Sequence, residues 1–140
     1  MPQAREPSTQ AATTTQALAS PLATILQIRD GLPGSHLRQA VQRFGHRQLF
    51  AQALNTSSAR LHRYYQRKAL DRRDSEKLMD TLRTLEQAST LWGCDEDALQ
   101  WLTTPIPALA GEPPAAWFDT FKGREWVRQV LNSIASGEFH

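Results

Sequence analysis

The chain has 140 residues, 40% of them hydrophobic, and a formal net charge of +2. This length is enough for one ordinary domain or two very small ones. No run approaches the roughly 20 apolar residues of a membrane span, and no apolar run follows a basic start, so we expect neither a membrane segment nor a secretory signal. The single cysteine, Cys94, excludes an internal disulfide and fits a reducing cytoplasm, where we expect the protein to work.

The N-terminal segment, residues 1–21, is rich in Gln, Thr, Ala and Ser and is therefore predicted to be disordered. The rest of the chain lacks convincing period-two alternation and predicts an all-α fold. Ser35 and Asp74 are predicted to cap two of its helices. Apolar spacing and stop signals predict helices over residues 22–30, 35–44, 47–54, 58–66, 74–92 and 95–103, a short turn at Pro113–Pro114, and a last helix between Gly123 and Gly137.

Charge is distributed unevenly along the chain. Residues 36–83 carry 11 Lys and Arg against 4 Asp and Glu, a net of +7, whereas residues 84–140 carry 3 against 8, a net of −5. A basic block of this kind is typical of a polyanion-binding surface, although two solvated faces of one domain would give the same count.

Residues 47–66, RQLFAQALNTSSARLHRYYQ, fit the twenty-residue pattern of a helix-turn-helix. Ala51 is the small fifth residue where the helices cross, and Asn55 is the ninth residue, which must tolerate a left-handed turn. Phe50, Leu54, Leu61 and Tyr64 fall on packing positions. In this motif the start of the second helix enters the major groove of DNA.

Polar and basic side chains on the second helix predict a DNA-binding surface. Arg63 is placed to read guanine, and Ser57 and Ser58 to contact bases or phosphate. The other cations are better placed for phosphates. A solvated basic face that binds nothing is the alternative. The predicted DNA-binding residues are Ser57, Ser58, Arg60, His62, Arg63, Arg67, Lys68, Arg72 and Arg73.

The acidic half, residues 91–140, resembles the toxin-binding domain of Xre-type antitoxins, the MbcA/ParS-like family that is paired with RES-domain toxins. The upstream sequences GLPGSHL and SEKLMDTLRTLEQASTLWG also resemble that family. This chain departs from it at Ala110, where a second glycine is usual. The matching residues are Gly93, Ala98, Trp101, Leu102, Pro105, Ala108, Leu109, Gly111, Pro114, Gly123, Val127, Leu131 and Gly137.

The resemblance implies a function and its partners. Such antitoxins form dimers, bind a NAD-consuming or ADP-ribosyl-transferring toxin with their C-terminal domain, and repress their own operon. It implies a helix-turn-helix domain over residues 22–90 and a toxin-binding domain over residues 91–140. The implied partners are the cognate toxin, palindromic operator DNA and a second copy of the chain. The helix over residues 74–92 is expected to join the two parts and to carry part of the dimer contact.

The proline-rich segment WLTTPIPALAGEPPAAWF, residues 101–118, then reads as a stiffened loop that loses little entropy when the toxin binds. Of Trp101, Trp117 and Trp126, at least two are expected to be core residues of a small helical domain rather than surface contacts. The last residues form either a frayed tail or a segment inserted into the toxin. The predicted toxin-binding residues are Trp101, Pro105, Pro107, Trp117, Phe118, Trp126, Glu138, Phe139 and His140.

Two further readings remain. A stand-alone helix-turn-helix regulator, whose C-terminal part senses a ligand or only dimerises, would share the basic half. An enzyme is not expected, because no nucleophile–base pair, metal-ligand spacing or phosphate loop is present. Asp95, Glu96 and Asp97 are expected to stabilise a helix N-terminus rather than to catalyse. No cofactor and no metal are expected.

Overall fold

The computed structural model describes residues 20–138, and every regular element in this range is a helix, which confirms the all-α prediction. The predicted disorder of residues 1–21 falls almost wholly outside the described range, and Pro21 already belongs to a helix. The elements are α2 (Pro21–Asp30), α3 (Gly34–Phe44), α4 (Arg47–Ala53), η1 (Ser58–Arg60), α5 (His62–Tyr65), α6 (Arg72–Trp92), α7 (Asp95–Leu102), η2 (Pro107–Leu109), η3 (Pro114–Trp117) and α8 (Phe121–Ala135).

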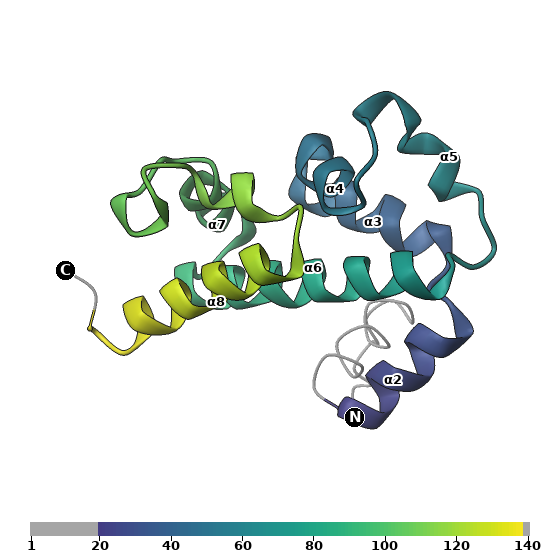
Figure 1. Cartoon of the computed structure of the whole chain (residues 1–140), viewed down its shortest axis with the longest axis horizontal. Helices are drawn as coiled ribbons and strands as arrows, with labels where there is room; N and C mark the ends of the chain where they lie inside the picture. The colour runs from purple at the N-terminus through teal and green to yellow at the C-terminus, as the bar shows by residue number, and fades with distance from the viewer. Residues whose placement is uncertain (1–19, 139–140) are drawn as a thin grey trace, which may run out of the picture.

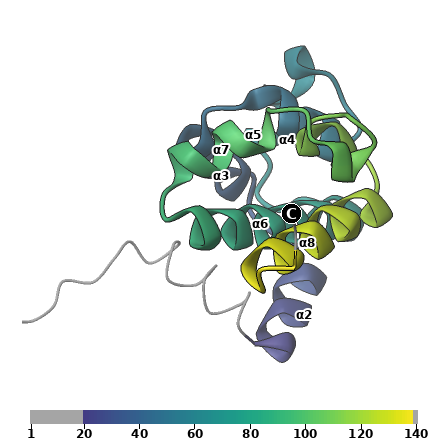
Figure 2. The same cartoon turned by 90° about the vertical axis from the view of Figure 1, so that its left-hand side faces the viewer.

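Helix α6 is the central element of the fold. It has 21 residues, so at 1.5 Å per residue it is roughly 31 Å long. Helices α7 and α8 pack along it, α4 lies against it, and α2 lies on the side of α6 opposite α3 and α4 (Figures 1 and 2). The basic helix α5 and the acidic helix α7 are therefore held at opposite ends of the molecule (Figure 1).

Buried apolar side chains form one continuous cluster that joins the two sequence halves. Leu37, Phe50 and Leu61 come from residues 22–90, and Leu102 and Phe118 come from residues 91–140. Full burial of a side chain of this size contributes about 1.5–3 kcal/mol, so the halves stabilise each other through this cluster. The division at residue 90/91 stays a prediction, and α6 runs across it.

Several helix ends lie where the sequence predicts them. Helix α3 ends at Gly45 (φ 68°) and α6 ends at Gly93 (φ 91°), both left-handed residues whose amides donate to the carbonyl four residues back. Helix α7 begins with Asp95, as expected for a carboxylate near a helix N-terminus.

Three helix starts differ from the prediction. Helix α3 begins at Gly34 rather than after Ser35, because the Gly34 amide donates to the Arg67 carbonyl (2.9 Å) and a side chain at Gly34 would collide with the Tyr64 carbonyl. Asp71, not Asp74, caps α6, and its Oδ1 accepts from the Asp74 amide at 2.7 Å.

The third difference concerns the last helix. Helix α8 begins at Phe121, two residues before Gly123, because the Thr120 hydroxyl accepts from the Gly123 amide at 2.9 Å. None of the helices between residues 20 and 138 combines the length and the apolar character needed to cross a membrane.

Candidate functional site

The turn after α4 has the geometry that the helix-turn-helix pattern requires. Asn55 adopts φ 58°, the left-handed conformation predicted for the ninth residue. Ala51 is fully buried at the fifth position, and Phe50, Leu54 and Leu61 are each no more than 3% exposed. Tyr64, the fourth predicted packing residue, is only half-buried against the core, so the predicted local packing is complete at the other positions.

The second helix of the motif is less regular than predicted. Residues 58–66 form a 3-10 turn, η1, then Leu61 in right-handed helical conformation, then the four-residue α5. The Ser57 hydroxyl accepts from the Arg60 amide at 3.2 Å, and the Ser58 hydroxyl donates to Gln48 Oε1 at 2.6 Å. The two serines predicted to contact DNA thus also stabilise the start of this helix.

The predicted basic side chains line the outside of the α5 segment. His62 and Arg63 are exposed on α5, and the other predicted cations are exposed on the flanking residues. Arg67 stacks over the Tyr64 ring, with its guanidinium carbon 4.5 Å from the ring centroid, and lies 3.8 Å from an Asp74 carboxylate oxygen. The remaining arginines and the lysine make no ion pair with any residue from 20 to 138; they are Arg60, Arg63, Lys68, Arg72 and Arg73.

The proline-rich segment is a loop closed on itself. The Ile106 amide donates to the Glu112 carbonyl at 3.2 Å, and the Gly111 amide donates to the Ile106 carbonyl at 3.0 Å. Pro105 and Pro107 are exposed on this loop. Ala110 adopts φ 62°, a conformation that favours glycine, which is the residue usual there in the family that the sequence resembles.

Two tryptophans form an aromatic patch beside this loop. The Trp117 and Trp126 ring centroids are 5.3 Å apart, and Trp117 Nε1 donates to the Leu109 carbonyl at 3.1 Å. Trp126 is 36% exposed, and both rings border a pocket of about 400 Å³. Rigid, partly exposed tryptophans of this kind are typical anchors of protein interfaces.

The other predicted toxin-binding residues have different environments. Trp101 is half-buried, and its ring centroid lies 6.1 Å from that of Trp92. Phe118 is fully buried in the core, so its prediction as a contact residue is wrong: it supports the loop from beneath. Glu138 is exposed beyond α8, and the prediction for Phe139 and His140 lies outside the described residues.

A buried ion cluster, which the sequence analysis missed, holds the loop against α6. Asp80 Oδ2 accepts from Arg124 Nε at 2.6 Å, and Asp80 Oδ1 lies 3.0 Å from Arg128 Nη1. Arg124 Nη1 also donates to the Phe118 carbonyl at 2.6 Å. Burial lowers the pKa of Arg128, and the Asp80 charge opposes that effect. The partners lie 44 or more residues apart, so no local sequence pattern could have revealed them.

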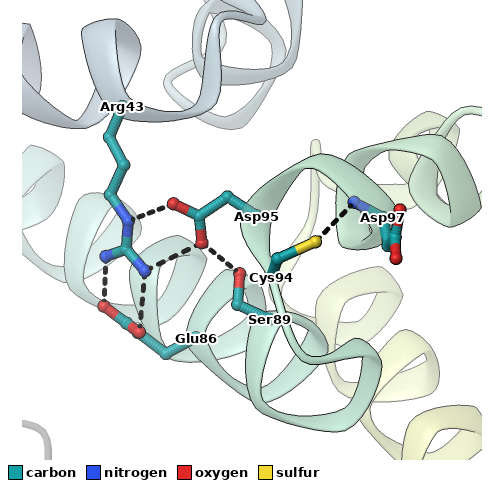
Figure 3. A network of polar contacts seen from close by, with 6 residues as sticks. All are labelled: Arg43, Glu86, Ser89, Cys94, Asp95 and Asp97. Atoms are coloured by element: carbon teal, nitrogen blue, oxygen red, sulfur yellow. Dashed lines mark hydrogen bonds and ion pairs between the residues drawn. The ribbon is translucent and has the colours of Figure 1, made fainter.

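A second ion network joins α3 to the α6–α7 corner (Figure 3). Arg43 Nε donates to Asp95 Oδ2 at 2.9 Å, while its Nη1 donates to Glu86 Oε2 at 2.5 Å. Ser89 Oγ donates to Asp95 Oδ1 at 2.7 Å. The hydrogen bond from Arg43 holds the pKa of Asp95 below its usual value. Asp95 is thus a structural residue at the helix start, as the sequence predicted.

Two hydrogen bonds connect the helix-turn-helix segment with the loop. Gln52 Nε2 donates to the Ala116 carbonyl at 2.9 Å, and Asn55 Nδ2 donates to the Asp119 carbonyl at 3.2 Å. The turn of the predicted DNA-binding motif therefore rests directly on η3 and on the residues that follow it.

Comparison with known proteins finds a family model that matches most of the acidic half. Residues 87–137 match the family model described as the antitoxin Xre/MbcA/ParS C-terminal toxin-binding domain, a segment that runs from the end of α6 through α8. The resemblance to Xre-type antitoxins with a C-terminal toxin-binding domain is confirmed.

A relative along most of the chain points to the same class. A protein of Sphingobium sp. (strain YBL2), described as "Prs ADP-ribosylating antitoxin", is 26% identical over 132 residues, covering 86% of this chain and 83% of that protein. Together with the family match, this similarity supports an antitoxin of a toxin–antitoxin system.

Proposed function

We propose that this chain binds and blocks a RES-type, NAD-consuming toxin or a related ADP-ribosyl-transferring toxin, and that it represses its own operon as a DNA-bound homodimer. The observation that carries the proposal is that the matched toxin-binding segment, residues 87–137, presents a closed proline loop beside the Trp117–Trp126 patch. The name of the Sphingobium relative includes ADP-ribosylation, which favours the ADP-ribosyl-transferring class for the toxin.

The loop fits the binding role because it is ordered before the partner arrives. Its internal hydrogen bonds, its prolines and the bond from Arg124 to the Phe118 carbonyl fix its backbone. A partner that binds such a loop does not have to order it, so more of the contact free energy remains as affinity. The net charge of −5 over residues 84–140 would also complement a basic, nucleotide-binding cleft.

Co-purification from the native operon tests the toxin assignment. We expect a stoichiometric partner, identified by mass spectrometry, whose NAD-consuming or ADP-ribosyl-transferring activity falls when the chain is added. Because the core is shared between the halves, deletion of residues 91–140 would expose apolar side chains of α6. Point substitutions in the full chain are therefore the sharper variants.

Trp126→Ala and Trp92→Ala form a matched pair for this test, since the two tryptophans are 36% and 37% exposed. Loss of an interface anchor costs about 2 kcal/mol, so Trp126→Ala should weaken toxin binding roughly 30-fold, while Trp92→Ala should change it little. A loss confined to Trp92→Ala would move the contact to the Trp92–Trp101 pair. Equal affinity in both variants and wild type would exclude both patches.

The basic surface supports the second half of the proposal. Five exposed cations without ion pairs to any residue from 20 to 138 lie on α5 or on either side of it, and this arrangement suits phosphate contacts that position a helix on DNA. Binding to the DNA upstream of the operon, measured by fluorescence anisotropy at several salt concentrations, tests it.

A stand-alone regulator is the competing function. It predicts operator binding that responds to a small ligand, together with a homodimer that recovers no protein partner. Operator binding that changes only when the toxin is added would contradict it. No contact of the structure favours this reading over the antitoxin.

A further inference from the structure

Helix α2 exposes several large apolar side chains on the surface of the molecule. Six large hydrophobic side chains between residues 20 and 138 are exposed, and three of them lie on α2. Leu22, Ile25 and Leu26 of α2 are 66%, 45% and 47% exposed, and Phe121 at the start of α8 is 56% exposed. No residue of α2 is buried. Apolar gatherings of this kind mark interaction sites.

A groove runs beside this face. It has a volume of about 720 Å³ and is lined by residues of α2, α6 and α8, among them Ile25, Ile28, Met79 and Phe121. Leu22 and Leu26 lie four residues apart on α2 and form a ridge next to the groove. A ridge and a groove on the same face allow two such faces to interdigitate.

We propose that a second copy of this chain packs on this α2 face, with the Leu22–Leu26 ridge of each copy in the groove of the other. This inference rests on the homodimer of the proposed function and assigns its contact surface. A two-fold contact of this kind uses the same patch on both copies, so the patch must complement itself.

The charges of the groove meet that requirement. Arg73, Lys77 and Arg83 bring positive charge and Glu76 and Asp119 bring negative charge to the same groove, which the paired Asp80 and Arg124 also line. None of these three cations, nor Glu76 or Asp119, forms an ion pair with another residue from 20 to 138. Across a two-fold axis each sign can face the other, whereas a partner of uniform charge would leave the groove groups of the same sign opposed by like charge.

The other occupants fit less well. Residues 1–19 contain only Met1 and Leu18 as large apolar residues, too few to fill an apolar groove. The toxin is proposed to bind within residues 87–137, and α2 lies outside that segment and across α6 from α7 (Figure 1). A dimer through α2 also leaves α5 and the proline loop uncovered, because both lie on the far side of α6 (Figures 1 and 2).

Sedimentation equilibrium of the full chain at 1–100 µM tests the proposal with two opposed variants. We expect a wild-type dimer and, for Ile25→Glu combined with Leu26→Glu, a dimer dissociation constant raised at least about 100-fold, because two apolar contacts per copy are lost. Trp126→Glu, which alters an exposed large hydrophobic residue elsewhere, should stay dimeric. Unchanged circular dichroism establishes that each variant is folded.

Toxin capture by the same variants separates the two proposals. The α2 variant should still capture toxin as a monomer, and Trp126→Glu should capture less while remaining dimeric. A dimeric α2 variant, or a monomeric wild-type chain at 100 µM, overturns the α2 interface whatever the toxin result. A dimer that depends on α2 but captures no toxin retains the interface and refutes the antitoxin proposal.

Thiol cross-linking covers the case in which the double variant does not fold. Leu26→Cys mixed with Phe121→Cys, both in a Cys94→Ser background, should form an intermolecular disulfide on mild oxidation, because the ridge of one copy lies in the groove that Phe121 of the other copy lines. Gln129→Cys in the same background, exposed on α8, replaces Phe121→Cys in the control mixture. Equal cross-linking in both mixtures overturns the interface.

Discussion

Replacement of Asp80 by Asn tests how much the buried ion cluster stabilises the fold. The substitution keeps the side-chain shape but removes the only carboxylate that contacts both Arg124 and Arg128 within the described residues, whose side chains are 5% and 9% exposed. Removing one partner of a buried ion pair costs about 3–5 kcal/mol, since the other charge stays buried without compensation. We expect about 3 kcal/mol, because the amide oxygen still accepts one hydrogen bond.

Urea unfolding, followed by tryptophan fluorescence, measures this loss. With a slope of about 2 kcal/mol per M, the midpoint should fall by roughly 1.5 M. Glu125→Gln is the control, because its partner Lys122 is 87% exposed and the pair is 3.0 Å apart on the surface of α8. Exposed pairs contribute at most about 1 kcal/mol. A loss for Asp80→Asn no larger than that of the control would refute the reasoning.

Three further predictions concern the turn, the histidine and the basic surface. Ala110→Gly should raise the free energy of unfolding by about 0.5–1 kcal/mol. The steric strain of an alanine in the left-handed conformation is larger than the entropy that a glycine loses on folding. Burial lowers the pKa of His36 from 6.5, so the unfolded chain binds the extra proton and stability should fall as the pH drops below about 6.5; His36→Gln should reduce that fall in urea unfolding. In operator binding, Arg63→Ala should relax the base preference. Lys68→Ala should weaken the affinity for all DNA sequences alike and lower the slope of log affinity against log salt concentration by about 1.

Each of these has an outcome that contradicts it. A less stable Ala110→Gly chain would show that the left-handed turn carries no strain. A pH profile identical in wild type and His36→Gln would remove the histidine from the acid response. Base preference unchanged by Arg63→Ala would place that residue away from the bases, and Lys122→Ala, at 87% exposure outside the basic half, is the control for both DNA variants.

The sequence predicts the parts of the fold that depend on local chemistry. Asn55, Gly45 and Gly93 adopt left-handed conformations where the turn and the helix stops require them, since backbone sterics restrict those positions to few residue types. The resemblance to the toxin-binding domain was also predictable from the sequence, because the pattern of glycines, prolines and tryptophans extends over about fifty residues, and residues 87–137 match the family model.

Features that depend on distant residues were not predictable. Gly34 begins α3 because the end of α5 approaches its backbone, and nothing near Gly34 in the sequence indicates that approach. The sequence predicts Phe118 as a toxin-binding residue of the loop, yet the fold buries its side chain in the core. The exposed face of α2 was not predictable either. The sequence predicts a helix over residues 22–30, but only the structure shows that no residue of this helix is buried.

The bonds from Gln52 and Asn55 to η3 and the residues after it end on backbone carbonyls, those of Ala116 and Asp119. A backbone carbonyl is present whatever side chain the residue carries. These two hydrogen bonds therefore remain possible when Ala116 or Asp119 is substituted. The pairs Asp80–Arg124 and Arg43–Asp95 instead need matching side chains on each side of residue 90. Chimeras that exchange residues 91–140 between relatives should therefore lose most stability when Asp80 or Arg124 is left without its buried partner, whereas loss of the more exposed Arg43–Asp95 pair should cost at most about 1 kcal/mol. This requirement restricts the recombination of C-terminal segments in evolution and in design.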